Sequence, residues 1–458
     1  MFRWPYSALL TLTILLAACT SVATPAPAPA APAPPTQAPA QSTEAPAAAT
    51  EPPSTAGSSE VVTIEYWIPA GQGREPAVAE VVKAFEATHP TIKVNVTAIP
   101  FGEFANALQV GLASDNPPDA AFAGGPDIPF LAYNGALRPV DDLLTAEDRA
   151  DFNPDLIDMV SLDGVAYGMP FANSGVAMYY NVDSFEAAGV EVPTSLDDVW
   201  TWPEFVENVN RVVAHQTEEG HKVWGMVGLD NPIISTFFAW TLVRSGSAPG
   251  SPLWDGIAPD HTTVAGYIDT PEALEAYAFY QSLYTSGFAP NENVPDAFGT
   301  GQAATLFAIP PTAATLTRDF PDLKWAVMPI PYLKTPLTHT GSFAHILAAR
   351  STRSEAAGEF IHFFSSPDGY LTYHATTAMI PGRKSLQDEL PELQSGFLKT
   401  VYDEILAWGQ ARPGGPGHSI FNRIVATDMM RNIALGTDIK TAVASTVDEA
   451  DAQLAQFR

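Results

Sequence analysis

Residues 61–98 read VVTIEYWIPAGQGREPAVAEVVKAFEATHPTIKVNVTA, and this stretch decides the fold class. Residues 61–67 are rich in β-branched and aromatic side chains, which favours a strand. The next apolar side chains share one face of a helix, namely Val78, Val81, Val82 and Phe85. Residues 92–96 alternate between apolar and polar side chains and predict a second strand. A strand, a helix and a strand within about 35 residues imply a parallel sheet.

The alternation of strands and helices continues along the chain. We expect a helix from Phe101 to about Ala113, followed by a short strand over residues 119–123. Thr270-Pro271-Glu272 predicts the start of another helix, which ends at Gly287. Two later helical faces are formed by Ala357, Phe360, Ile361 and Phe364, and by Ile439, Val443, Val447, Ala450 and Leu454. This order predicts an α/β protein with two sheets.

Composition excludes several classes of protein. The 458 residues include 22 Lys and Arg and 51 Asp and Glu, so the formal net charge is −29. A polyanion is repelled by nucleic-acid phosphates and by anionic lipid headgroups, so we expect no nucleic-acid partner. The single cysteine excludes a disulfide scaffold.

The N-terminus predicts export. Arg3 precedes an apolar run over residues 8–16, and Leu16-Ala17-Ala18-Cys19 follows. This run is too short to span a membrane. It resembles a bacterial lipoprotein signal, which implies a signal peptide over residues 1–18 and a diacylglyceryl thioether on Cys19. The alternative is an ordinary secretory signal with an incidental cysteine.

A tether follows the signal. Residues 20–59 contain ten prolines and no aromatic residue, so they offer no material for a packed core. Chains of this kind extend as semi-rigid spacers, and forty residues reach on the order of 100 Å. We expect a disordered tether between the lipidated cysteine and a folded part that begins near residue 60.

The folded part resembles the extracellular solute-binding proteins of ABC importers, in the sugar-binding branch that includes maltose-binding protein. The resemblance covers roughly residues 60–458 and rests on the shared order of several short segments. These are residues 85–90 (FEATHP), 116–119 (NPPD) with 124–127 (GGPD), 167–170 (YGMP) with 179–181 (YYN), 201–205 (TWPEF), 298–306 (FGTGQAATL), 379–385 (MIPGRKS) and 411–413 (ARP).

The resemblance implies a two-lobed periplasmic-binding-protein-like (type II) α/β fold. The chain would cross between the lobes three times, near residues 171–173, 327–329 and 380–381. The first lobe would comprise residues 60–172 and 330–380, and the second residues 173–329 and 381–458.

The implied function is capture of a mono- or oligosaccharide in the cleft by hinge closure. The protein would be a monomer outside the cytoplasmic membrane, held there by its lipid anchor only. It would deliver the sugar to the transmembrane subunits of an ABC permease with its ATPase. No cofactor, no metal and no catalytic residue is expected.

A sugar site pairs flat aromatic rings with hydrogen-bonding side chains. Trp67 follows the first strand at the edge where open α/β sheets bind ligands, and Gln72 lies in the next loop. Gly341 is small enough to allow close approach of the backbone. The resemblance places further candidates at the cleft, giving the full set Trp67, Gln72, Asp127, Asn173, Ser174, Trp240, Phe307, Gly341, Ser342, Trp408 and Arg412. Phe307 is included because the aromatic platform that many relatives carry after the Gly-x-Ala-Ala segment is missing here.

Two other functions remain open from the sequence. An extracellular glycosidase would need paired carboxylates, for which Asp141-Asp142, Asp197-Asp198 and Glu218-Glu219 are the material. A polyamine- or metal-binding relative on the same fold would use the patch of His215, Glu218, Glu219 and His221, whose spacing fits no standard zinc pattern. Residues 299–304 imitate a dinucleotide fingerprint, but no strand is predicted before them.

Overall fold

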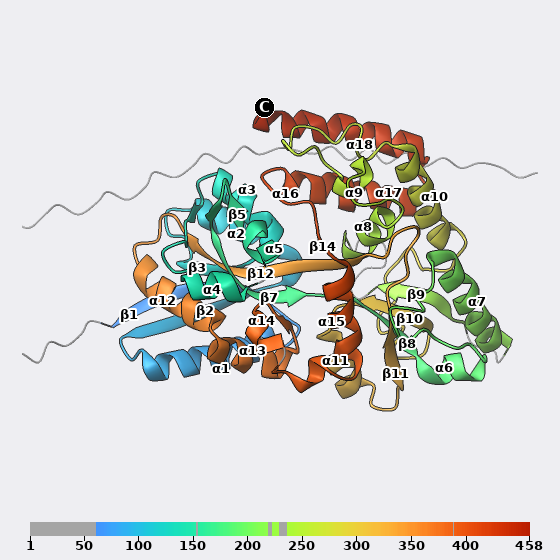
Figure 1. The fold of residues 1–458 in the computed structure, drawn as a ribbon, viewed down its shortest axis with the longest axis horizontal. Coiled ribbons are helices and arrows are strands. Elements are labelled where there is room, and N and C mark those ends of the chain that lie inside the picture. Colours follow the sequence, from blue (N-terminus) through green and yellow to red (C-terminus); the bar gives the residue numbers. More distant parts are fainter. Residues whose placement is uncertain (1–60, 153, 219–221, 229–235, 388) are drawn as a thin grey trace, which may run out of the picture. The chain divides into compact units, whose positions relative to one another are not determined.

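The strand–helix–strand unit at the start of the folded part forms as the sequence predicts (Figure 1). Strand β1 (Val62–Pro69) pairs in parallel with β2 (Ile92–Ile99), and helix α1 (Arg74–Thr88) connects them. Val78, Val81 and Phe85 are fully buried, as their helical spacing indicates. Because a parallel connection must cross the sheet, this unit sets the direction of the neighbouring strands.

The computed structural model describes residues 61–152, 154–218, 222–228, 236–387 and 389–458. The predicted signal, Cys19 and the proline-rich tether lie outside these residues. No helix among the described residues combines the length and the apolar character that a membrane span requires. The described residues, from Val61 onward, belong to one compact unit.

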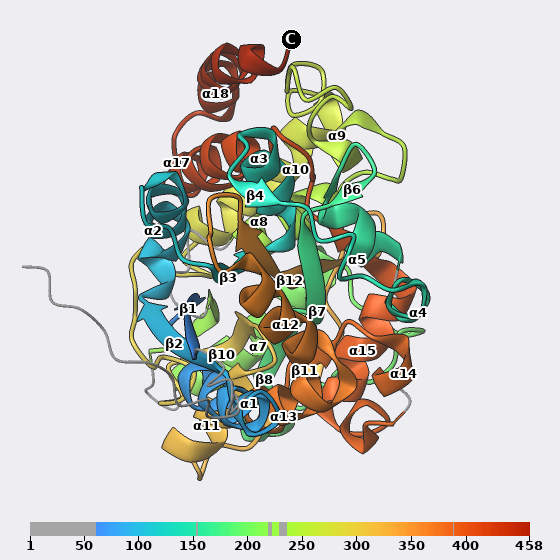
Figure 2. The same ribbon diagram turned by 90° about the vertical axis from the view of Figure 1, so that its left-hand side faces the viewer.

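The larger sheet has eight strands in the order β13–β7–β12–β3–β1–β2, with β14 and β4 also paired to β12. Strand β3 is parallel to β1, whereas β12 is antiparallel to both β3 and β7. Figure 2 shows β7 and β12 lying side by side. The bounds are β3 (Ala120–Gly124), β4 (Leu137–Arg138), β7 (Gly168–Ser174), β12 (Thr338–Ala348), β13 (Ile380–Pro381) and β14 (Gly409–Ala411).

Helices pack against this sheet and bury a first core, which includes Tyr66, Phe122, Phe171 and Phe364. The helical elements of this part are α2 (Phe101–Ala113), η1 (Gly125–Asp127), α3 (Ile128–Tyr133), α4 (Ala146–Asp151), α5 (Pro154–Met159), α12 (Ser354–Ser365), α13 (Pro367–Thr377) and α14 (Lys384–Gln387). A small hairpin of β5 (Ser161–Leu162) and β6 (Val165–Ala166) is separate from the main sheet.

The second sheet has four strands in the order β11–β8–β10–β9. Its strands are β8 (Ala177–Asn181), β9 (Trp224–Gly228), β10 (Ala303–Ala308) and β11 (Trp325–Met328). The helices around it are α6 (Val182–Ala187), α7 (Trp202–Glu218), α8 (Thr236–Arg244), α9 (Pro252–Asp255), α10 (Pro271–Thr285) and α11 (Thr312–Asp319). They bury a second core, which includes Trp202, Phe205, Trp240 and Tyr280.

The C-terminal segment, residues 391–458, completes this second part. Helix α15 (Phe397–Trp408) contributes Leu398 and Val401 to a third cluster, where they join Tyr179 and Leu306 of the second sheet. The remaining elements are η2 (Pro391–Leu393), α16 (His418–Ile420), the π-helical η3 (Phe421–Met429), α17 (Met430–Ala434), α18 (Ile439–Leu454) and η4 (Ala455–Phe457). Residues from η3, α17 and α18 enter the second core.

The chain passes from one sheet to the other between strands that are consecutive in the sequence. It leaves the first sheet after Ser174 and enters the second at Ala177. It returns between Met328 and Thr338. After β13, Leu386 still packs in the first core, while Leu390 packs in the third cluster. The exact lobe boundaries given above stay predictions.

Several sequence predictions are confirmed at the level of single helices. Helix α2 has the expected bounds, and Thr270 caps α10 by accepting a hydrogen bond from the Ala273 amide. The predicted faces of α12 and α18 are largely buried. The dinucleotide-like residues 299–304 have no strand directly before them: within the described residues, 290–302 form turns and bends, and β10 begins at Ala303.

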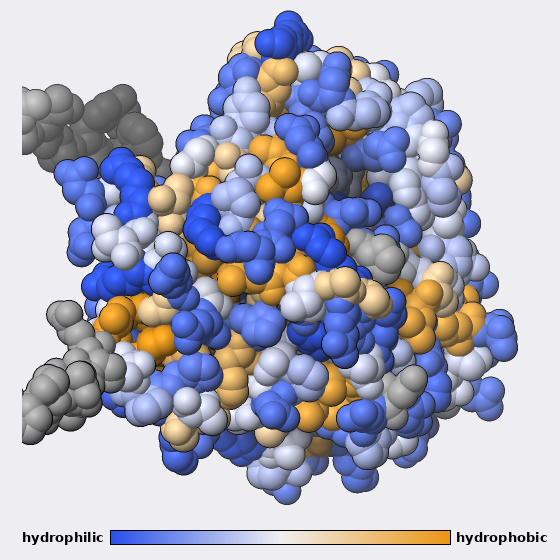
Figure 3. All heavy atoms as spheres, turned by 60° about the vertical axis from the view of Figure 1, so that its left-hand side comes forward, coloured by the Kyte–Doolittle hydropathy of each residue, from blue (hydrophilic) through white to orange (hydrophobic). Residues whose placement is uncertain are grey.

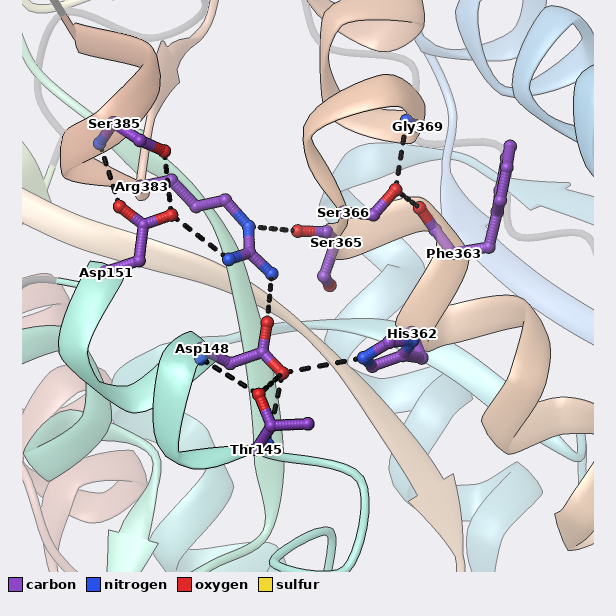
Figure 4. Close-up of polar contacts among 10 residues, drawn as sticks. All are labelled: Thr145, Asp148, Asp151, His362, Phe363, Ser365, Ser366, Gly369, Arg383 and Ser385. Atoms are coloured by element: carbon purple, nitrogen blue, oxygen red, sulfur yellow. Dashed lines mark hydrogen bonds and ion pairs between the residues drawn. The ribbon is translucent and has the colours of Figure 1, made fainter.

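A buried ion-pair network ties the segment after β13 to α4 (Figure 4). Arg383 is 5% exposed, and it forms ion pairs with Asp148 at 2.7 Å and Asp151 at 3.1 Å. Its Nε donates to the Ser365 carbonyl at 2.6 Å, and Ser385 donates to Asp151. Burial is the largest single influence on the pKa of Asp148 and acts to raise it. The hydrogen bonds from Thr145 and Arg383, together with the charge of Arg383, outweigh burial and lower the pKa to about 2. Arg383 and Ser385 of the 379–385 segment are therefore structural anchors.

We predict that Arg383→Gln destabilises the protein far more than the loss of an ordinary surface ion pair. Removing the guanidinium leaves Asp148 in a largely buried place without its cation, which typically costs about 3–5 kcal/mol. Denaturant unfolding followed by circular dichroism measures the difference. The matched control is Arg138→Gln, which breaks the exposed pair with Asp142 and should cost about 0.5 kcal/mol or less. Equal losses in the two variants would contradict this view of the network.

Candidate functional site

The candidate site lies where β12 extends past the edge of the first sheet. Phe343 is opposite Gly124, the last residue of β3, so residues 338–342 continue beyond the carboxyl end of that strand. This edge is where open α/β sheets place their ligands. On this extension β12 pairs with β14 in parallel, with His339 opposite Gln410. The extension therefore carries residues of the C-terminal segment to the sheet edge.

The same part of β12 brings together four of the predicted site residues. Gly341 is opposite Ser174, and Ser342 is opposite Asn173. The Ser174 hydroxyl donates to the Gly341 carbonyl at 3.1 Å. A Cβ at Gly341 would lie 3.0 Å from the Ser174 Oγ and 3.1 Å from the His339 Nε2, so a larger residue would crowd both. Asn173 is 3% exposed, and its Oδ1 has no hydrogen-bond partner among the described residues.

Two further predicted residues, Trp240 and Arg412, line one small cavity of about 10 Å³. We call it the α8–β12 cavity. It has room for about one water-sized group. Its lining comes from α8, from β12 and the residue before it, and from the segment around β14, and consists of Trp240, Thr241, Arg244, Leu337, His339, Gln410 and Arg412. The cavity thus joins side chains of the second core to the extended strand of the first sheet.

Trp240 is held rigidly on α8. It is 2% exposed and lies edge-on to Phe421 of η3, with 4.8 Å between the ring centroids. Gly256 makes this position possible, because a Cβ there would lie 2.6 Å from the indole ring, and its φ of +75° also favours glycine. The indole Nε1 has no hydrogen-bond partner among the described residues. A buried indole N–H aimed at no acceptor is available to a ligand oxygen.

The two arginines of the cavity are fixed by different partners. Arg244 donates to the Ala411 carbonyl and places its guanidinium over the Trp254 ring, 5.0 Å from the centroid. Arg412 donates to Asn422 at 3.3 Å. Burial lowers the pKa of Arg244 to about 10 and also lowers the pKa of Arg412. Both remain cations at neutral pH.

Two histidines, His339 and His418, interact electrostatically with one or both of these arginines. Burial, reinforced by repulsion from Arg412, Arg244 and His418, lowers the pKa of His339 well below its ordinary value. Burial also lowers the pKa of His418 to about 4, against the attraction of Asp127. Both imidazoles are therefore neutral at pH 7 and can accept or donate hydrogen bonds.

Asp127 connects the first sheet to His418 and Ser419. It lies in η1 directly after β3, and its Oδ1 is 3.5 Å from the His418 Nε2 and 3.5 Å from the Ser419 Oγ. The His418 Nδ1 contacts the Pro413 carbonyl, which places a proton on that nitrogen and leaves Nε2 as an acceptor. Nε2 and the Asp127 carboxylate are thus two acceptors side by side, which a ligand hydroxyl could satisfy.

The other predicted residues lie away from the α8–β12 cavity. Trp67 packs its ring against Gly111 of α2. Gln72 accepts a hydrogen bond from Arg74 at the start of α1. Phe307 is 3% exposed in the second core, with its ring edge-on to Phe238 at 5.1 Å, so it presents no platform here. Trp408 is the partly buried last residue of α15. Ligand-binding roles for these residues stay predictions.

The sequence reasoning missed Arg244, His339 and His418. Arg244 was detectable as a cation that ends the apolar run of residues 237–243, one helical turn after Trp240. His339 was detectable from its position two residues before Gly341, because alternate residues of a strand share one face. His418 gives no local signal, since only the folded chain brings it to Asp127.

Of the carboxylate pairs considered for catalysis, Asp141-Asp142 has structural partners. Asp141 pairs with Arg149 at 2.6 Å and accepts from the Ala166 amide. Asp142 pairs with Arg138. His215 lines a separate, open pocket of about 250 Å³ with Asp183, Asp322 and Lys324. Glu219 and His221 lie outside the described residues.

The outer surface gives little guidance to the site. The face in Figure 3 is mostly hydrophilic, with apolar groups in separate patches. Exposed large apolar side chains include Val110 and Phe101, both on α2. The convergence of rigid aromatic and polar groups in the interior is therefore the stronger indication of a binding site.

Comparison with known proteins identifies the family. The profile of the bacterial extracellular solute-binding proteins matches residues 80–397, which is more than half of the chain. The chain belongs to this family. The resemblance seen in the sequence is confirmed, and the family is one of binding proteins.

Individual relatives are distant but cover most of the solute-binding protein. A binding protein of Brucella abortus is 25% identical over 340 residues, covering 72% of this chain and 77% of its own. An ABC transporter solute-binding protein of Thermotoga lettingae, solved with α-D-tagatose, has a TM-score of 0.74 at 20% identity and covers 86% of this chain and 100% of its own. An ABC substrate-binding protein of Listeria monocytogenes, solved with cycloalternan, has a TM-score of 0.74 at 23% identity, covering 86% and 99%. These structures confirm the predicted two-part α/β fold.

We predict opposite changes in the pKa of His418 when its two charged neighbours are neutralised. Asp127→Asn removes an attraction and should lower the pKa below about 4. Arg412→Gln removes a repulsion and should raise it. An NMR titration of the histidine C–H signals, assigned with His418→Gln, measures both. His345 is the internal control, because its pKa of about 3 is lowered by burial alone. A His418 pKa that Asp127→Asn leaves unchanged would refute the contact.

Proposed function

We propose that this solute-binding protein captures a carbohydrate where its two parts meet and delivers it to an ABC permease, and that one polar group of the carbohydrate enters the α8–β12 cavity. The observation that carries the proposal is the meeting of Trp240 with hydrogen-bonding side chains of β12 and the β14 segment. Sugars present hydroxyl groups along their edges, so a site for them needs several hydrogen-bonding groups in fixed positions.

The composition of the site supports this function. Trp240 is buried in the second core and supplies its indole N–H, while His418 and Asp127 offer adjacent acceptors for a hydroxyl group. Arg244 and Arg412 offer donors in fixed planes. The ligands solved with the Thermotoga and Listeria proteins, a ketohexose and a cyclic oligosaccharide, are consistent with a carbohydrate here.

The way the cavity is assembled favours capture by closure. Its lining unites α8 of the second core with β12 of the first sheet, and the chain connects the two sheets through short crossings. A ligand held by both parts binds the closed arrangement better than an open one, which is the condition for a ligand to shift such an equilibrium. The closed form would then be the state that the permease and its ATPase recognise.

The N-terminal segment suits delivery at a membrane. Cys19 would carry the lipid anchor, and residues 20–59 would let the folded part reach on the order of 100 Å from the bilayer. The protein would act as a monomer outside the cytoplasmic membrane, with no cofactor. The alternatives, a glycosidase or a polyamine- or metal-binding protein, draw no support from residues that meet in the α8–β12 cavity.

The proposal predicts a saturable change in intrinsic tryptophan fluorescence with at least one carbohydrate. Trp240 lines the cavity, so occupancy alters its surroundings. The purified protein is titrated with a panel of mono- and oligosaccharides, both neutral and acidic, and its melting temperature is recorded in parallel. A ligand at 100 times its Kd should stabilise the fold by about 2.7 kcal/mol. Spermidine and divalent cations serve as comparison ligands. If one of these shifts both readouts while every carbohydrate leaves them unmoved, the proposal fails.

A further inference from the structure

The α8–β12 cavity is a basic site inside a strongly acidic protein. The whole chain has 22 Lys and Arg against 51 Asp and Glu. Arg244 and Arg412 nevertheless line this one cavity, together with His339. Net charge does not locate a site, whereas buried cations that converge set the local potential.

Arg244 is a buried cation of the cavity that forms no ion pair among the described residues. It is 8% exposed, and its Nε has no hydrogen-bond partner among the described residues. The arginine ion pairs found in the described part of the chain belong to other arginines. Its observed contacts are a backbone carbonyl and the Trp254 ring. Burying a cation without a carboxylate costs free energy, which a bound anion would offset.

The pKa of a neighbouring group is shifted by the positive charge of the two arginines. His339 feels repulsion from Arg412, Arg244 and His418, and burial adds to it in lowering its pKa. Two carboxylates attract these arginines: Asp255 attracts Arg244, and Asp127 attracts Arg412. Asp127 is already beside His418 and Ser419. Burial lowers the pKa of both arginines more than the attraction of these two carboxylates raises it.

We propose that the ligand is a carbohydrate that bears a carboxylate, as a uronic acid does, and that Arg244 binds this carboxylate in the α8–β12 cavity. This inference rests on the proposed function and narrows its substrate class. The planar guanidinium matches a carboxylate, and a charge-assisted hydrogen bond is stronger than a neutral one. A cavity with room for one water-sized group suits a carboxylate oxygen better than a phosphate with three terminal oxygens.

The test compares carbohydrates that differ only in their charge. Isothermal calorimetry on the whole protein measures hexuronic acids and their di- and trisaccharides, the neutral hexose counterparts of equal length, and hexose phosphates. The wild type should bind one uronic acid ligand about 10- to 100-fold more tightly than its neutral counterpart. Arg244→Gln should reduce this preference to near one, because the preference comes from the charge of the guanidinium. Arg318→Gln is the matched control, because Arg318 is exposed on α11 and pairs with Asp319.

Each outcome decides the inference. A neutral sugar that binds as tightly as its acid counterpart refutes it and leaves the proposed function standing. A hexose phosphate that binds more tightly than every uronic acid also refutes it. Failure of every carbohydrate to bind refutes the function and the inference together. If Arg244→Gln does not fold, the wild-type preference and Arg244→Lys decide, because lysine keeps the charge and loses the planar fork, so the preference should fall without vanishing.

Discussion

The pairing of β12 beyond the edge of the first sheet is the constraint on which the site depends. Strand β12 has eleven residues, whereas β3 beside it has five, so one end of β12 must find other partners. It finds β14 on the extension, together with the last residues of β7. Unpaired backbone groups in a buried place would be costly, and these pairings satisfy them. The result is that Arg412 and His339 are delivered to the face that α8 approaches.

The network around Arg383 has the complementary role of fixing the segment after β13 to the first part of the protein. Arg383 and Ser385 bind the carboxylates of α4, and the chain then proceeds to the third cluster. The 379–385 segment, which resembles the family pattern, therefore has a structural role that needs no contact with a ligand. Basic residues are scarce in this chain, so their use at buried places such as this anchor and the α8–β12 cavity is informative. Arg383 is neutralised by Asp148 and Asp151 of the protein itself, whereas we propose that Arg244 binds the carboxylate of a ligand.

Local signals in the sequence were sufficient to predict the α/β class, whereas the two-lobed architecture followed from the resemblance to a family. Periodicity and capping residues defined α1, α2, α10 and α18, and the short parallel connection defined the first sheet. The site was only partly accessible. Asn173, Ser174, Gly341 and Ser342 do meet on adjacent strands, and Trp240 and Arg412 share one cavity. Phe307 lies in the second core. The alternation of side chains along a strand does not show which of the two faces is turned to a ligand. His418 reaches Asp127 across almost three hundred residues, a distance no local pattern spans.

The most direct test of the account asks where a bound carbohydrate protects the backbone. Hydrogen–deuterium exchange, read by mass spectrometry, compares the free protein with the protein saturated by the sugar that fluorescence identifies. The account predicts slower exchange in peptides that cover residues 236–244, 338–342 and 409–418, which line or adjoin the α8–β12 cavity. Protection confined to α6, α7 and residues 322–324, around the open pocket of His215, would contradict it.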